Sequence, residues 1–235
     1  MLVLGLDTET TGLEPEPDRI IEIAAVLWDW DTKIPVQMIS ILVDHEIEIP
    51  EEIVKLTGIT PEMILKYGIL EEEACERLWT IRMLADYTMA HNAKFDRGFI
   101  EAARVRTGQG EWQVPWLCSM EDIKYPEGVK TRNLTHLAAE HGFVSPWKHR
   151  SLFDVLTMLK IASNYDLDAI IARSKEPVIY VQALVTYNDN QKAKDFNFRW
   201  NPDKKIWWKG QKQSDWEAER DGYQFKSEFM AGAPE

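Results

Sequence analysis

The chain opens on Leu2-Val3-Leu4-Gly5-Leu6-Asp7-Thr8-Glu9, an apolar run that ends in two acidic residues. The apolar part predicts a β-strand buried on both faces, as in the middle of an α/β sheet. Alternate side chains of a strand point to the same face, so we expect Asp7 and Glu9 to lie side by side. Two close carboxylates repel each other, and both stay ionised only with a cation between them. The pair is a candidate metal site, and a solvated strand end is the alternative.

The composition predicts a globular protein with one large domain and one small one. The chain has 235 residues, of which 45% are hydrophobic. Cys75 and Cys118 lie far apart in the sequence, which fits a reducing cytoplasm and excludes a paired-thiol metal site. No apolar run reaches the length of a membrane span, and the first strand starts at once. We therefore expect a cytoplasmic protein without a signal peptide or a membrane contact.

The net charge of -12 argues against broad attraction to nucleic acid. Residues 173–235 carry 11 basic and 10 acidic side chains, which leaves 16 basic and 29 acidic ones before them. Nearly all of the acidity therefore lies in the first part of the chain. If that part binds nucleic acid, it must do so through metal ions and a local groove.

Turn signals and periodicity divide the chain into a large α/β domain, residues 1–172, and a small α+β module, residues 178–229. A polar link containing Pro177 separates them. Ser151 is a good N-cap for the last helix of the large domain. We expect strands over 2–9, 20–30 and 37–43 as an antiparallel meander, further strands over 87–90, 114–118, 178–186 and 206–208, and helices over 70–84, 93–107, 133–141 and 189–197.

Three further residues complete a chemical set with Asp7 and Glu9. Asp96 and Asp154 each fall in the first turn of an expected helix, and His149 lies in a loop five residues before Asp154. Taken singly, they also fit surface acids that stabilise helix N-termini and a solvated histidine. Together they suit two hard cations about 4 Å apart, which stabilise the attacking and leaving oxygens of a phosphoryl displacement. A histidine can take a proton from the attacking water near pH 7.

Three segments resemble the motifs of the DEDDh-type 3′→5′ exonucleases, the DnaQ-like group that includes exonuclease X, ribonuclease T and the proofreading subunits of replicases. They are Asp7-Thr8-Glu9-Thr10-Thr11-Gly12, His91-Asn92-Ala93-Lys94-Phe95-Asp96 and His149-Arg150-Ser151-Leu152-Phe153-Asp154. The segment from Ile49 to Thr60 is also similar to a connecting stretch of this family. The resemblance covers residues 1–172 in order. A histidine five positions before the last aspartate is typical of the DEDDh type, whereas the tyrosine type would have tyrosine at position 150.

The resemblance implies a ribonuclease H-like mixed sheet flanked by helices. It implies that two divalent ions, Mg²⁺ or Mn²⁺, are held by Asp7, Glu9, Asp96 and Asp154, with His149 as general base. It further implies that the enzyme, a phosphodiester hydrolase, releases nucleoside 5′-monophosphates from the 3′ end of DNA, in proofreading or repair. The residues implied to seat the terminal nucleotide are Thr8, Thr10, Leu13, His91, Asn92 and Phe95, of which Phe95 could equally be core packing. An RNA-trimming 3′ exoribonuclease and a proofreading or binding subunit of a polymerase complex are the alternatives.

The small module combines basic residues with four of the ten tryptophans. Exposed aromatic rings stack on bases while Lys and Arg contact phosphates, which suits single strands. The alternative is that tryptophans form the core of a domain too small to close otherwise. For Trp200 and one of Trp207 and Trp208 we expect the core. The module loosely resembles a C-terminal module of exonuclease X-like proteins and could bind nucleic acid or a replication or repair partner.

Overall fold

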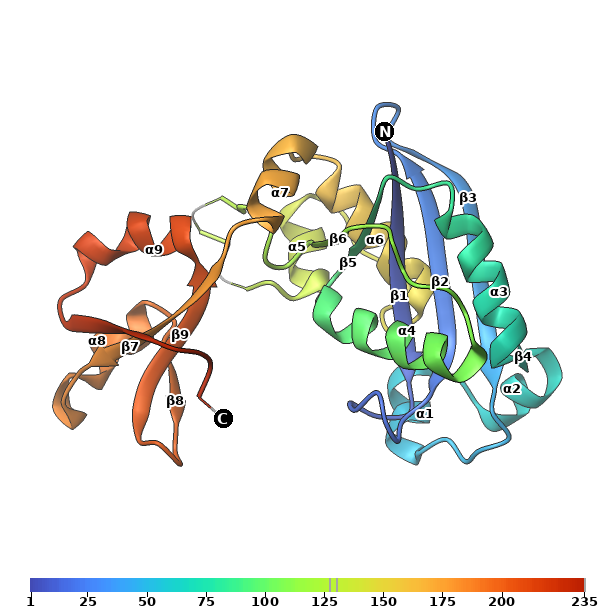
Figure 1. The fold of residues 1–235 in the computed structure, drawn as a ribbon, viewed down its shortest axis with the longest axis horizontal. Helices are drawn as coiled ribbons and strands as arrows, with labels where there is room; N and C mark the ends of the chain where they lie inside the picture. The colour runs from blue at the N-terminus through green and yellow to red at the C-terminus, as the bar shows by residue number, and fades with distance from the viewer. Residues whose placement is uncertain (127, 130, 235) are drawn as a thin grey trace. The chain divides into compact units, whose positions relative to one another are not determined.

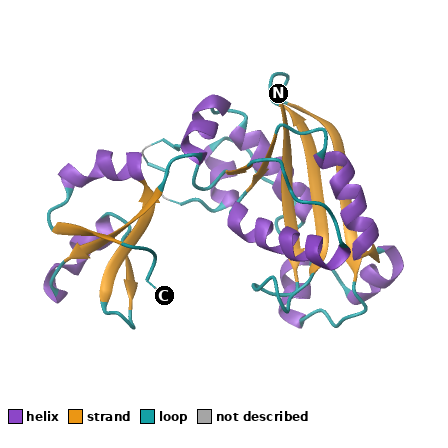
Figure 2. Ribbon diagram, in the orientation of Figure 1, coloured by secondary structure: helices purple, strands orange, loops and turns teal. Residues whose placement is uncertain are grey.

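The computed structural model describes residues 1–126, 128–129 and 131–234, which form two compact units. Unit 1 is Met1–Ser174 and unit 2 begins at Lys175. Each unit has its own sheet and its own apolar core (Figures 1 and 2). Within the described residues, no helix is both long and apolar enough to cross a membrane.

Unit 1 is built on a six-stranded mixed sheet in the order β4-β3-β2-β1-β5-β6. The first three strands pair antiparallel, as the predicted meander requires. The strands β5 and β6 extend the sheet beyond β1 in parallel, and β4 pairs in parallel with the end of β3. The bounds are β1 Leu2–Thr10, β2 Ile20–Asp29, β3 Ile34–Asp44, β4 Ile69–Leu70, β5 Tyr87–Ala90 and β6 Trp116–Cys118. The predicted α/β class with a mixed sheet is confirmed.

Helices cover both faces of this sheet, as Figure 1 shows. Alternate residues of β1 belong to different cores: Leu4 and Leu6 pack with α3 and α4, whereas Val3 packs with α5, α6 and α7. Because side chains alternate, Asp7 and Glu9 follow Val3 onto the face covered by α6. The bounds are α1 Glu51–Thr57, α2 Pro61–Tyr67, α3 Glu71–Arg82, α4 Ala93–Thr107, α5 Leu134–Glu140, α6 Ser151–Ala162 and α7 Leu167–Ser174.

Gly5 lets α6 approach β1 closely. A Cβ atom at Gly5 would lie 2.6 Å from the Leu159 Cδ1 atom and 2.7 Å from the Val155 Cγ1 atom. Real Cβ atoms essentially never lie so close to a neighbour, so any side chain at this position would push the helix away from the strand. The close contact fixes the start of α6 beside the carboxyl end of β1.

Unit 2 has a four-stranded antiparallel sheet in the order β10-β7-β9-β8. Its core contains Val181, Ala183, Ala193 and Phe198, with further aromatic rings packed around them. The bounds are β7 Val178–Leu184, α8 Asn190–Asp195, β8 Arg199–Asn201, β9 Ile206–Lys212, α9 Gln213–Glu219 and β10 Lys226–Met230, with 3₁₀ turns at Tyr187–Asp189 and Arg220–Gly222.

The expectation that Trp200 belongs to this core is wrong, because its side chain is 47% exposed. Phe198, two residues earlier on the chain, is buried in its place. Trp200 lies on the edge strand β8 and meets only one neighbouring strand. Trp207 does pack partly against the core, as expected for one of the two adjacent tryptophans.

Candidate active site

Three carboxylates meet where β1 ends beside the start of α6. Asp7, Glu9 and Asp154 each offer one carboxylate oxygen, and these oxygens lie within 4.8 Å of one another. All three residues are half-buried. The strand alternation places Asp7 and Glu9 on one face, and the close packing at Gly5 brings the first turn of α6 to them. The sequence-predicted acids from two separate segments are therefore neighbours in space.

Asp96 joins the site from the other side of β1. It lies buried in the first turn of α4, where one carboxylate oxygen, Oδ1, accepts hydrogen bonds from the Thr8 backbone N–H at 3.0 Å and the Thr8 hydroxyl at 2.9 Å. The strand β5 ends at Ala90, so β1 extends beyond its parallel partner and its Thr8 N–H is free for Asp96. Asp96 is not part of the three-oxygen group, but its charge acts on Asp7.

Burial raises the pKa of all four acids, and neighbouring negative charges add to this at Asp7, Glu9 and Asp154. The pKa of Asp7 is raised well above its usual value by burial and by the charges of Asp96, Glu9 and Asp154. Burial, with Glu22 and Asp154 nearby, raises the pKa of Glu9 to about 8. Burial raises the pKa of Asp96 to about 7 against the opposing hydrogen bonds from Thr8, and burial also raises the pKa of Asp154. Without a cation the site therefore favours protonated carboxyls near neutral pH.

This donor set fits a hard divalent cation. Mg²⁺ and Mn²⁺ prefer carboxylate oxygens, and the site offers oxygens from separate elements within one small group. A bound cation reverses the local electrostatics, since it stabilises the ionised carboxylates that burial and repulsion otherwise disfavour. The residues that would hold it are Asp7, Glu9 and Asp154, with Asp96 beside them.

His149 lies in the loop before α6 with its backbone in the left-handed region, at φ 58°. Such a conformation is uncommon for a residue with a side chain and is held here by the His149 N–H, which donates to Asp154 Oδ2 at 2.8 Å. Among the residues that the structure describes, its imidazole has no hydrogen-bond partner. The loop therefore presents an uncommitted, half-buried imidazole next to Asp154.

A fifth carboxylate, Glu22, was missed by the sequence analysis. Glu22 lies opposite Glu9 in the β1–β2 pairing and is 1% exposed. Its Oε1 accepts from Arg150 Nη2 at 2.8 Å, and its Oε2 accepts from the Ser151 backbone N–H at 2.9 Å. The expected N-cap role of Ser151 is therefore wrong. Ser151 is the first residue of α6, Arg150 occupies the cap position without a side-chain cap, and Glu22 satisfies the helix terminus from across the sheet.

The sequence did contain a signal for Glu22. It is the only charged residue inside the apolar run 20–28, and a charge in a buried strand needs a partner. The partner could not be identified, because Arg150 lies 128 residues further along the chain. Through Arg150 and Ser151, Glu22 fixes the segment that carries both His149 and Asp154.

We predict that Glu22→Gln lowers the hydrolytic rate by about 10- to 100-fold, the usual effect of removing an outer partner of a metal site. The amide keeps the shape of Glu22 but leaves Arg150 without its buried counter-charge, so the start of α6 loses its anchor. Rates and Mn²⁺ affinity should be measured beside Glu48→Gln, which removes an exposed acid from a loop. Equal effects of the two substitutions would contradict the positioning role.

The residues implied to seat the terminal nucleotide differ in which of their groups are free to contact a ligand. Thr8 and Thr10 are buried, and their hydroxyls already donate to Asp96 and, at 2.6 Å, to the Gly12 carbonyl. Because the Thr8 backbone N–H also donates to Asp96, only the other backbone groups of this segment remain for a ligand. Leu13 is 79% exposed in the loop after β1, so its apolar side chain is free to contact a nucleotide.

His91, Asn92 and Phe95 lie at the start of α4. The His91 Nε2–H donates to the Arg132 carbonyl at 2.7 Å, so Nδ1 accepts from the Ser119 hydroxyl at 2.7 Å. Burial lowers the pKa of His91, which favours this neutral form. Only the ring face of His91 is therefore left for a nucleotide. Asn92 is exposed, whereas Phe95 packs against the core and the Phe99 ring at 4.9 Å, the alternative considered for it.

A family model and related sequences both identify the family of this chain. A family model described as Exonuclease (RNase_T) matches residues 4–162. The epsilon subunit of DNA polymerase III from Aquifex aeolicus is 30% identical over 158 residues, which cover 66% of this chain and 76% of that protein. The PolC-type DNA polymerase III of Thermotoga petrophila is 31% identical over 149 residues, 63% of this chain but only 10% of the polymerase. The chain thus spans about a tenth of the PolC-type relatives that it matches.

Among solved structures, exonuclease I is similar with a TM-score of 0.63 and 19% identity over 77% of this chain and 48% of that one. Escherichia coli exonuclease I in complex with a dT13 oligonucleotide is similar with a TM-score of 0.62 and 17% identity, over 78% and 48% of the two chains. At this identity the likeness concerns the fold, and it confirms the predicted ribonuclease H-like architecture of unit 1. Because the exonuclease family model matches residues 4–162, more than half of the chain, the chain belongs to the DnaQ-like exonuclease family and is a nuclease.

Proposed function

We propose that the chain is a divalent-metal-dependent 3′→5′ exonuclease that hydrolyses DNA to nucleoside 5′-monophosphates. The observation that supports this most is the group of three carboxylate oxygens within 4.8 Å of one another, with the uncommitted imidazole of His149 on the neighbouring loop. The family match supplies the nuclease class, and the polarity and mechanism are our inference. The proposed cofactors are two Mg²⁺ or Mn²⁺ ions, held by Asp7, Glu9, Asp96 and Asp154.

The reaction uses few protein groups. An imidazole nitrogen of His149 accepts a proton from water, and the water oxygen bonds to the phosphorus atom of the terminal phosphodiester as its bond to the 3′ oxygen breaks. The 3′ oxygen leaves with a proton from solvent, and the released nucleotide carries the phosphate on its 5′ oxygen. When bound, the metal ions stabilise charge on the attacking and leaving oxygens. The Thr8 and Thr10 backbone, the Leu13 side chain, Asn92 and the His91 ring face seat the terminal nucleotide.

A second candidate function is proofreading within a polymerase. Its support is that the relatives include an epsilon subunit and PolC-type enzymes of DNA polymerase III. In that case a replication protein would be the partner and the same hydrolysis would remove mispaired ends. Action in DNA repair, RNA trimming and a cytoplasmic location stay predictions from the sequence.

Polarity and substrate are tested with DNA and RNA oligonucleotides, single- and double-stranded, labelled at the 5′ or the 3′ end. With Mn²⁺ we expect a ladder of shortening products from the 5′-labelled strand and immediate release of a labelled mononucleotide from the 3′-labelled one. Chelation with EDTA should stop both. A shortening ladder on the 3′-labelled strand, internal cuts, or full activity in EDTA would contradict the proposal.

A further inference from the structure

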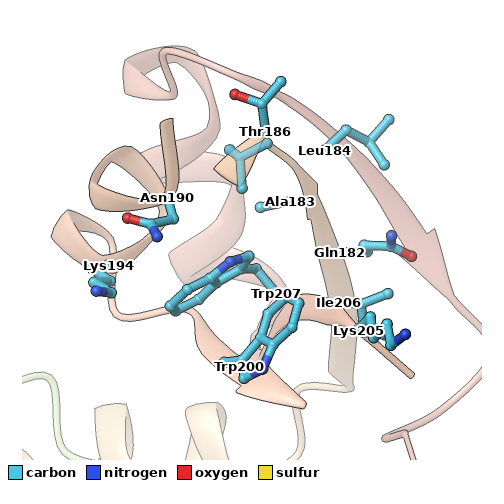
Figure 3. A pocket seen from close by; sticks show the side chains of 11 residues that line it. Gln182, Ala183, Leu184, Thr186, Asn190, Lys194, Trp200, Lys205, Ile206 and Trp207 are labelled. Carbon is cyan, nitrogen blue, oxygen red and sulfur yellow. The ribbon is translucent and has the colours of Figure 1, made fainter. Parts of the chain in front are cut away.

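Unit 2 contains a pocket of about 890 Å³ that has no part in the carboxylate site of unit 1. It is formed by the end of β7, by α8 and by the β8–β9 hairpin, as Figure 3 shows. A volume of this size falls in the usual range for pockets that hold small molecules or parts of larger ligands. The chemistry of its walls indicates what such a ligand is.

Two tryptophans form one wall of this pocket. Trp200 on β8 and Trp207 on β9 are directly paired across the hairpin, so both side chains emerge on the same face. Their ring centroids are 5.5 Å apart at an angle of 49°, and Trp200 is 47% exposed. Together the two rings make a contiguous aromatic patch at the pocket, and such patches mark binding surfaces more often than single exposed rings do. The exposed ring offers a flat apolar surface for stacking.

Lysines flank the tryptophans. Figure 3 shows Lys194 on one side of the ring pair and Lys205 on the other. The Lys194 Nζ atom lies 5.5 Å from the centre of a Trp207 ring, and Lys205 is exposed at the hairpin turn. In the part of the chain that the structure describes, neither lysine has a carboxylate partner, whereas Lys192 and Lys209 are paired with Asp189 and Glu219.

The local charge has the same sign as these lysines. Residues 192–212 contain seven basic and two acidic side chains, although the whole chain carries a net charge of -12. Unpaired cations on both sides of an exposed aromatic surface complement a ligand with negative charges spaced around flat rings. Single-stranded nucleic acid has this chemistry, since its phosphates alternate with base faces that are free to stack. In a duplex these faces are covered by neighbouring base pairs.

We propose that this pocket binds single-stranded nucleic acid. A base stacks on the exposed face of the Trp200 ring, which is itself supported by Trp207. The phosphates on either side of that base contact Lys194 and Lys205. The site is a second contact for the strand, separate from the one at which hydrolysis is proposed. A protein ligand is the competing occupant of an apolar pocket, and it predicts a different outcome in the experiment below.

The test is the fluorescence anisotropy of a short 5′-fluorescein-labelled oligothymidylate titrated with the full chain in EDTA. Trp200→Ala should raise Kd by about 5- to 150-fold, the range expected for one stacked base. Trp200→Phe keeps an aromatic face and should restore most of the affinity. The double variant Lys194→Ala/Lys205→Ala should make the slope of log K against log salt shallower by about 1.4, the value for two phosphate contacts of a single strand.

Lys226→Ala is the matched control, because Lys226 is an exposed lysine on β10, at the opposite edge of the same sheet. Unchanged affinity for the oligonucleotide in both Trp200→Ala and the double lysine variant would overturn the proposal. This is the result that a pocket for a protein ligand predicts. Equal weakening by Lys226→Ala, or an equal dependence on Trp200 with a duplex of the same length, would also overturn it. The readout needs no cleavage, so its outcome is independent of the proposed exonuclease reaction.

Discussion

Asp7→Asn is expected to reduce DNA hydrolysis by at least about a thousandfold, which corresponds to the loss of about 4 kcal/mol of transition-state stabilisation. The amide has the size of the carboxylate but not its charge, and Asp7 is the acid on which the charges of Glu9, Asp96 and Asp154 all act. The measurement is kcat on a labelled oligonucleotide with Mn²⁺, with Glu48→Gln as a surface control. A loss of less than tenfold would exclude Asp7 from the metal site.

The same substitution should stabilise the metal-free protein at alkaline pH. Folded-state pKa values of about 8 for Glu9 and about 7 for Asp96 lie above the ordinary values of 4.5 and 3.8. The folded state therefore binds more protons than the unfolded state between these limits. The contribution of these two acids to the free energy of unfolding is fully present below about pH 4 and is lost as pH rises through 7 to 8. Asp7 contributes in the same direction, because burial and the charges of Asp96, Glu9 and Asp154 raise its pKa, and Asp7→Asn removes this contribution.

Thermal melting in EDTA measures this effect. Each kcal/mol changes the melting temperature of a domain of this size by about 2–4 °C. We expect Asp7→Asn to raise the melting temperature more at pH 8.5 than at pH 5.5, and Mn²⁺ to raise that of the wild type at pH 8.5 only. A wild-type protein that melts higher at pH 8.5 than at pH 5.5 in EDTA would contradict the raised pKa values of these acids.

His149→Ala is expected to lower kcat by about 10²- to 10⁴-fold, the usual contribution of a positioned general base. The imidazole is absent from the three-oxygen group, and the hydrogen bond from His149 to Asp154 comes from the backbone N–H, so the metal site should survive the substitution. Added imidazole should restore part of the rate. His136→Ala is the matched control, because His136 is exposed on α5 and plays no part in the site. A normal rate in His149→Ala would exclude the general-base role.

Much of unit 1 could be predicted from the sequence because its signals are local. The buried run before Asp7 predicts the central strand, and alternation predicts that Asp7 and Glu9 share a face. The first-turn positions of Asp96 and Asp154 follow from helix periodicity. The contact between Glu22 and Arg150 depends on the register of β1 against β2 and on how closely α6 packs at Gly5. Neither the register nor this packing can be derived from a short stretch of sequence. For the same reason Ser151 was wrongly expected to be the N-cap of α6.

In unit 2 the sequence predicted β7 and β9 but missed β8 and β10, and it wrongly placed Trp200 in the core. Trp200 shares a face of the sheet with Trp207, which packs partly against the core, but Trp200 lies on the edge strand β8 and is 47% exposed. Phe198, directly before this strand, is buried in the core of unit 2. The exposure of Trp200 could not be derived from its neighbours along the chain. It is the observation that separates a binding surface from core packing in this unit.

The central claim is that Asp7, Glu9, Asp96 and Asp154 form a divalent metal site that is independent of His149. The most direct test is a titration with Mn²⁺ followed by the electron paramagnetic resonance signal of the free ion at pH 8, in the wild type, Asp7→Asn and His149→Ala. We expect the wild type and His149→Ala to remove the free-ion signal with equal affinity, and Asp7→Asn to leave it nearly unchanged. Equal binding by Asp7→Asn, or no binding by the wild type, would contradict the claim.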